Sequence, residues 1–137
     1  MPLKDVLIAK IAGNLLIAGL ILLAVFHALV LAGVLPSDIV WAGRAAGSGS
    51  DLYLMEGIAL AVTLLFLALV AIRLGYLWPG RMKTVARVAM WVIAVFFVLS
   101  AVGNLTSEAA LETFFFAPLA LVLTVLAFGL AVEKGPL

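Results

Sequence analysis

The chain has 137 residues, of which 67% are hydrophobic and 11% are charged, and its formal net charge at pH 7 is +1. Soluble domains carry about 25% charged residues, so a water-soluble globule of this size could not bury so much apolar side chain, and lipid must solvate much of it. The small net charge argues against a nucleic-acid partner, and the absence of Cys excludes disulfides, thiolate nucleophiles and Cys-ligated metal sites.

Four segments of the chain are long and apolar enough to cross a bilayer, which takes about 20 residues in a helix. They cover residues 5–35, 51–77, 84–103 and 108–132. The segments are apolar on all sides and show no alternation with a period of two, so they do not fit a transmembrane β-barrel. We therefore expect a single integral membrane domain over residues 1–137. Its fold would be all-α, an antiparallel up-down-up-down bundle of four transmembrane helices.

The first segment, residues 5–35, is longer than the apolar core of a signal peptide, which spans about 7–15 residues, and we interpret it as a retained helix. It contains the only His of the chain, His27, roughly 12 Å below the end of the segment. The connection that follows carries Arg44 and then the run GSGS. Because Gly and Ser impose little backbone preference, we expect residues 44–50 to be mobile or to fold over the mouth of the bundle.

The second segment, residues 51–77, contains Glu56 about 7 Å beyond Asp51 along the helix axis. A charged side chain inside a membrane costs about 2.5–3.5 kcal/mol on insertion scales, so it tends to face the bundle and to find a partner there. We expect Arg44 to reach this carboxylate. Simpler interpretations stay open: Arg44 could be a solvated loop residue, Glu56 could only hydrogen-bond a neighbouring helix, and His27 could be a packing residue.

The third and fourth segments are joined by a short polar connection. It brings Asn104, Glu108 and Glu112 to the same end of the bundle as the polar residues of the first two segments. The two Glu residues are one helical turn apart, and their like charges favour a water-facing position for at least one of them. Pro118 lies inside the fourth segment, where its missing N–H is expected to produce a kink.

The positive charges predict the orientation of the chain in the membrane. Seven of the eight Lys and Arg residues lie near the termini or around the connection between the second and third segments, and only Arg44 lies on the other side. The positive-inside rule then places both termini in the cytoplasm. We expect a multi-pass protein of the bacterial inner membrane, with membrane lipid as its surroundings. The basic connection could also attract anionic lipid.

Small and polar residues inside the segments predict how the helices pack. Small residues recur four apart at Ala9 and Gly13, at Ala24, Ala28 and Ala32, and at Gly57 and Ala61. Such spacings allow close helix approach, within the bundle or in a homo-oligomer. Asn14, Thr63 and Thr124 are expected to hydrogen-bond between helices.

The polar residues at the end away from the termini form the candidate ligand site. Its members are His27, Arg44, Glu56, Asn104, Glu108 and Glu112. We find no phosphate-binding Gly loop, nucleophile elbow or His pair, so we predict no catalytic residue, metal site or cofactor. The absence of such motifs favours a protein that is not an enzyme but leaves the question open.

Three functions compete at this stage. We favour an outward-facing, partly buried polar pocket that takes a small ligand or ion, for transport or binding. The first alternative is a structural or accessory membrane subunit with no ligand. The second is an intramembrane enzyme acting on a lipid-like or apolar substrate, in which His27 with Glu56, or two of the Glu residues, perform general acid–base work.

Overall fold

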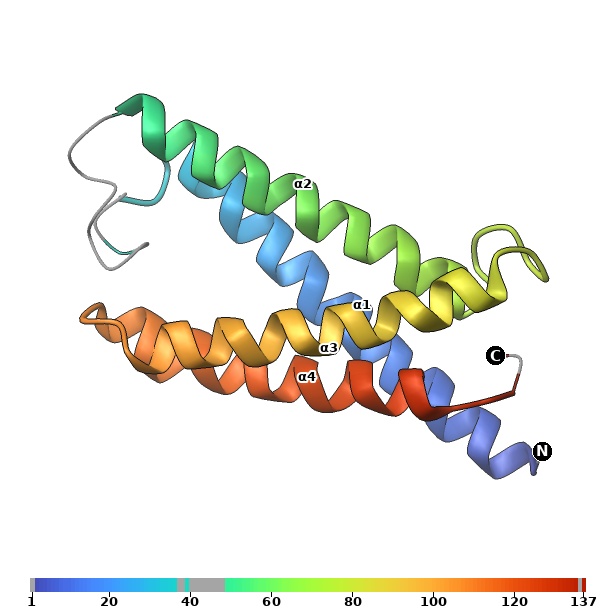
Figure 1. Cartoon of the computed structure of the whole chain (residues 1–137). Coiled ribbons are helices and arrows are strands. Elements are labelled where there is room, and N and C mark those ends of the chain that lie inside the picture. The colour runs from blue at the N-terminus through green and yellow to red at the C-terminus, as the bar shows by residue number, and fades with distance from the viewer. Residues whose placement is uncertain (1, 37–38, 40–48, 136) are drawn as a thin grey trace.

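The computed structural model describes residues 2–36, 39, 49–135 and 137, and the described chain is all-helical (Figure 1). Four helices are long and apolar enough to span a membrane, which confirms the predicted fold class and makes this an integral multi-pass membrane protein. The elements are α1 (Leu3–Leu31), α2 (Gly49–Arg73), α3 (Lys83–Leu105), the π-helical turn η3 (Glu112–Phe116) and α4 (Ala117–Val132).

Two of these helices end earlier than predicted, because a Gly residue stops each of them. Gly33 follows α1 and Gly75 follows α2, with φ angles of 72° and 77°. The N–H of Gly75 donates to the carbonyl of Ile72, and the N–H of Tyr76 donates to that of Ala71. This pair of bonds is the Schellman motif. The motif requires a residue in the left-handed conformation, which Gly adopts at little cost. The predicted ends at residues 35 and 77 were therefore wrong by about one turn.

The helices are arranged as two antiparallel hairpins (Figure 1). α1 pairs with α2, α3 pairs with α4, and α1 also packs on α4. Both termini lie at the same end of the molecule as the connection over residues 74–82, and we call this the basic end. The start of α2 and the connection after α3 lie at the opposite, distal end. The ribbons of α2 and α3 diverge toward the distal end.

The tightest packing lies in the half of the bundle near the basic end. Its largest fully buried apolar side chains include Leu16 and Leu20 of α1, Val70 near the end of α2 with Leu74 after it, Met90 and Ile93 of α3, and Leu123 and Leu130 of α4. Glycines let the helices come together here. A Cβ atom added to Gly13 would lie 2.4 Å from Cδ2 of Leu74, and one added to Gly19 would lie 2.5 Å from Cδ2 of Leu123.

The small residues divide into two groups. Ala9 and Gly13 are buried in the bundle, where they allow the close approach that their spacing predicted. Ala28 and Ala32 are exposed, and a Cβ added to Gly57 would meet nothing within 4 Å. These surface positions are not used for packing within the described chain. The homo-oligomer predicted from them stays a prediction.

Arg73 connects the two hairpins at the basic end, although in the sequence it is only one of the seven positive charges that predict the orientation. Its side chain is 6% exposed and donates to three carbonyl oxygens after α4 or in its last turn, those of Leu130, Glu133 and Gly135, at 3.2, 2.6 and 3.3 Å. α4 has no basic residue of its own in its last turn. Arg73 supplies the positive charge and the donors that a helix C-terminus requires.

The predicted interhelical hydrogen bonds form at one position of three. Asn14 accepts a bond from the Tyr76 hydroxyl at 2.8 Å, which joins α1 to the chain after α2. Thr63 and Thr124 instead donate to the carbonyl one turn back in their own helices. A hydroxyl on a helix always has that carbonyl within reach, so it needs no partner on a neighbouring helix.

Candidate functional site

The first component of the candidate site is a hydrogen-bonded pair between α1 and α2. His27 Nδ1 lies 2.7 Å from Glu56 Oε2, and the two residues are 29 positions apart in the chain. The His side chain is 18% exposed and the Glu side chain only 1%. A carboxylate at this depth is stable only with partners of this kind, because desolvation of a charge is costly. The pair therefore connects both helices of the first hairpin in the distal half of the molecule.

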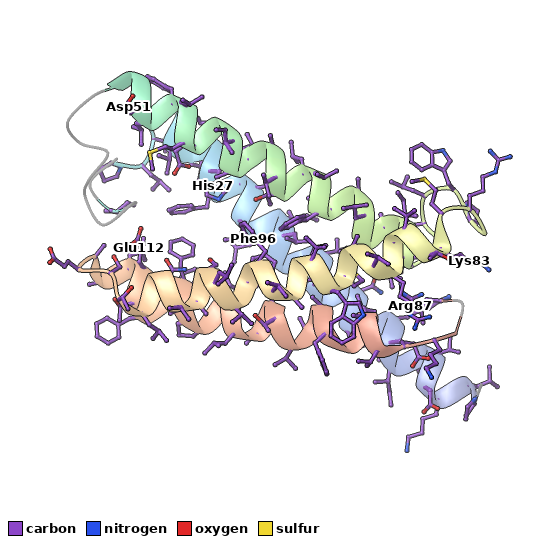
Figure 2. The ribbon with its side chains drawn as sticks, in the orientation of Figure 1. His27, Asp51, Lys83, Arg87, Phe96 and Glu112 are labelled. Atoms are coloured by element: carbon purple, nitrogen blue, oxygen red, sulfur yellow. The ribbon has the colours of Figure 1, made fainter. Side chains whose placement is uncertain are left out.

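The pair lines a cavity of about 700 Å³ between the diverging hairpins. Its polar lining consists of His27, Glu56, Thr63, Ser100, Asn104, Thr106, Ser107 and Glu112. Figure 2 shows His27 on the side of the first hairpin and Glu112 on the second. The volume is within the range of about 300–1,000 Å³ that small-molecule sites occupy.

The wall opposite the pair is a hydrogen-bonded network around the connection between α3 and η3. Ser107 Oγ donates to Glu112 Oε2, and Asn104 Nδ2 donates to Ser100 Oγ at 3.3 Å. The hydroxyl of Thr113 contacts the carbonyls of Asn104 and Ser107 at 3.1 and 3.0 Å. These bonds hold the Glu112 side chain against the connection, so the wall has a defined arrangement of acceptors and donors.

The π-helical turn η3 positions this wall. It covers Glu112–Phe116 and is followed by Ala117 and Pro118. The sequence predicted a kink at Pro118, and the structure shows that the helix changes its hydrogen-bond spacing there: the N–H of Ala117 reaches back five residues, to the carbonyl of Glu112. π-helical turns of this kind are frequent at functional sites.

Aromatic rings form much of the remaining lining. Phe26 of α1 contacts Phe116 of η3 edge to face, with 4.7 Å between the ring centroids. Phe66 of α2 contacts Phe96 of α3 in the same way, with 5.1 Å between the centroids. These two ring pairs bridge the hairpins across the cavity. Each contributes on the order of 1 kcal/mol beyond its buried area.

The cavity reaches the surface of the molecule along α3. Among its lining residues, Leu99 is 66% exposed and Phe96 is 44% exposed. Both lie well inside the apolar span Lys83–Leu105, which is the part of the helix that hydrocarbon would surround. The cavity is therefore open sideways along α3, and the exposed lining residues Gly103 and Thr106 open it toward the distal end as well.

The structure brings together four of the six predicted site residues. His27, Glu56, Asn104 and Glu112 all line the cavity. Glu108 is exposed and is not among the lining residues, as expected if one Glu of the pair faces water. Arg44 and most of the predicted covering loop lie outside the described residues. Among the described residues, Glu56 contacts His27. The predicted contact between Glu56 and Arg44 stays a prediction.

Several polar members of the site were not predicted from the sequence. Ser100 lies four residues before the predicted Asn104, on the same helix face, and could have been recognised from that spacing. Ser107 and Thr113 take part in the hydrogen bonds of the α3–η3 connection, and no simple sequence pattern predicts how this connection folds. Among the described residues, no three His, Asp or Glu side chains come together in a way that could hold a metal ion.

The site combines two carboxylates, an imidazole and several hydroxyl and amide groups with an aromatic lining. Such a set can accept hydrogen bonds from a ligand, hold a positive charge and surround an apolar body. Comparison of the chain with protein-family models, with curated proteins and with solved structures gives no match.

Proposed function

We propose that the protein binds a small amphipathic molecule that has an apolar body and carries a positive charge. The observation that carries the proposal is the Glu56 carboxylate, which is 1% exposed and lines a cavity of about 700 Å³ with a largely aromatic and aliphatic wall. A buried carboxylate inside a membrane span is costly, and such groups usually serve a substrate or ion path.

The lining favours a cation over an anion. Glu56 and Glu112 both contribute side chains, and among the described lining residues there is no Lys or Arg. Five Phe residues also line the cavity, and the faces of aromatic rings attract cations. An amine or quaternary centre near the carboxylates, with its apolar substituents against the rings, would fit both features.

The packing supports binding rather than free passage through the bundle. Below the cavity, the core consists of fully buried apolar side chains such as Leu20, Val70 and Ile93. A ligand would therefore enter and leave on the open sides of the cavity, along α3 or at the distal end. Transport would require the two hairpins to rock against each other and open a path at the basic end.

Two hydrophobic ions of similar size and opposite charge test the proposal directly. Tetraphenylphosphonium and tetraphenylborate are titrated onto the purified protein in lipid nanodiscs, with empty nanodiscs as the background. We expect saturable, one-to-one binding of the phosphonium cation and only background partitioning of the borate anion. Equal saturable binding of both ions, or of neither, would remove the cation site.

A matched pair of variants assigns the binding to the cavity. Glu56→Gln is nearly isosteric and keeps its hydrogen-bonding capacity but removes the charge, and we expect at least tenfold weaker cation binding, which corresponds to about 1.4 kcal/mol. Glu108→Gln makes the same chemical change at an exposed position outside the cavity and should bind within twofold of the parent. If a well-folded Glu56→Gln protein binds the cation normally, the His27–Glu56 pair is a structural connection and the accessory-subunit alternative is favoured.

A further inference from the structure

A second cavity lies at the basic end, separate from the candidate ligand site. It has a volume of about 480 Å³, and its lining includes four cationic side chains: Arg73, Lys83, Arg87 and Lys134. Among the described residues that line it, there is no Asp or Glu. Figure 2 shows Lys83 and Arg87 on α3 near the C-terminal segment of the chain. We call this cavity the basic pocket.

Three separate parts of the chain build the basic pocket. The end of α2 contributes Arg73, the beginning of α3 contributes Lys83 and Arg87, and the segment after α4 contributes Lys134. The three hydrogen bonds from Arg73 to carbonyls of this last segment and of α4 fix one wall in place. The pocket is therefore a product of the fold and not a run of charges along one segment.

The charges of three of these residues are not used within the described chain. Lys83, Arg87 and Lys134 make no hydrogen bond or ion pair with the described residues. Gathering like charges around one cavity raises its positive potential and attracts an anion. The first turn of α3 strengthens this effect, because its N-cap residue, Met82, provides no side-chain cap and the positive end of the helix dipole is at Lys83.

An apolar surface continues from the basic pocket along the bundle. Val88 and Trp91 line the pocket itself, and Val95 follows on the same face of α3 at helical spacing. All three are between 44% and 58% exposed. Trp91 also contacts Phe128 of α4, whose ring is 49% exposed. An amphipathic anion could place its charge in the pocket and its hydrocarbon along this surface, whereas free phosphate would use only the pocket.

We propose that the basic pocket binds the phosphate headgroup of an anionic phospholipid, with the acyl chains lying along the Val88–Trp91–Val95 face of α3. The pocket lies at the ends of three membrane spans, which is the depth of the headgroups. Its Trp suits the interface between headgroup and hydrocarbon, and its Arg and Lys donors suit phosphate oxygens.

The test uses short-chain lipids and the full chain in detergent. Dioctanoyl phosphatidylglycerol, dioctanoyl phosphatidylcholine and inorganic phosphate are titrated separately, and binding is followed by calorimetry. We expect one site for phosphatidylglycerol, at least tenfold weaker binding of phosphatidylcholine, and no measurable binding of phosphate at the same concentrations. Phosphate binding as tight as that of phosphatidylglycerol would overturn the lipid assignment, and so would equal affinity for the two lipids.

Two double variants with the same loss of charge locate the site. Lys83→Gln/Arg87→Gln should weaken phosphatidylglycerol binding at least tenfold, because it removes two side chains that line the pocket. Lys4→Gln/Lys10→Gln removes two charges from α1 at the same end, outside the pocket lining, and should change the affinity less than twofold. Equal losses in both variants would show general attraction to a basic surface and would overturn the pocket. If the first variant unfolds, Lys134→Gln replaces it, with an expected loss of at least threefold.

Discussion

At the scale of single residues, the chain places a carboxylate inside a membrane bundle by giving it an imidazole partner from the neighbouring helix. The distance of 2.7 Å between His27 Nδ1 and Glu56 Oε2 is that of a strong hydrogen bond. Hydrogen bonds to charged groups contribute about 1.5–3 kcal/mol, more than neutral ones. The energetic role of this pair can be measured independently of any ligand.

A double-mutant cycle isolates this contribution. We expect His27→Leu and Glu56→Leu each to lower the free energy of unfolding. The double variant should lose less free energy of unfolding than the two single losses add up to, with a coupling of about 1–3 kcal/mol. The reason is that substitutions of two residues in direct contact do not have additive effects. The measurement is unfolding of the four proteins in mixed micelles. Strict additivity would mean that the bond contributes no stability of its own.

At the scale of elements, glycines act by two different physical means. Gly33 and Gly75 end helices because they adopt the left-handed conformation with positive φ. Gly13 instead leaves room for the side chain of Leu74 to pack against the helix. Gly57 has neither function within the described chain, because its φ is not positive and a Cβ added there would meet no atom within 4 Å. Replacement by Ala should therefore have opposite effects at Gly13 and Gly57.

Gly13→Ala and Gly57→Ala test this difference. At Gly13 the new methyl group would overlap the buried Leu74 side chain, and overpacking of this kind costs about 1–3 kcal/mol. At Gly57 the methyl group meets open space, and replacing Gly by Ala inside a helix stabilises it by about 0.5–1 kcal/mol. Thermal unfolding in detergent should show a lower midpoint for the first variant and a higher one for the second. Destabilisation at Gly57 would indicate that this face packs against another molecule.

The same elements show how much the sequence can predict. Helix number, order and type follow from apolar length, so these predictions were correct. The helix ends were misplaced because hydropathy continues past Gly33 and Gly75, although the two glycines were visible. The role of Arg73 could not be predicted, because its three carbonyl partners are 57–62 positions away in the chain. Likewise, the positions of His27 and Glu56 along their segments predict that both lie toward the same end of the bundle. Only the packing of α1 on α2 shows that they meet.

At the scale of the whole molecule, charge is strongly polarised. Seven of the eight Lys and Arg residues belong to segments at the basic end, with Asp5 and Glu133 beside them, whereas Asp51, Glu56, Glu108 and Glu112 belong to the distal half. The fold brings both termini and the 74–82 connection together, so the positive charges form one group on one side of the spans. This arrangement is what the positive-inside rule requires for a single preferred orientation.

Reporter fusions test the orientation in cells. We expect alkaline phosphatase fused after Leu137 to be inactive and green fluorescent protein at the same position to be fluorescent, as for a cytoplasmic C-terminus. The same reporters fused after Ser107, which follows three spans, should give the opposite result. Phosphatase activity from the Leu137 fusion would reverse the orientation and would place the ligand site on the cytoplasmic side.

The opening of the cavity along α3, beside Leu99 and Phe96, has a kinetic consequence if the ligand proposal holds. A molecule that enters from hydrocarbon must first dissolve in the bilayer, so its association rate depends on its concentration there. In a series of alkyltriphenylphosphonium ions, the association rate constant is calculated from the ligand concentration in water. This rate constant should rise in parallel with the membrane partition coefficient of the ion. Stopped-flow measurements in nanodiscs would show this. An association rate constant that is independent of alkyl length would mean that the ligand arrives directly from water.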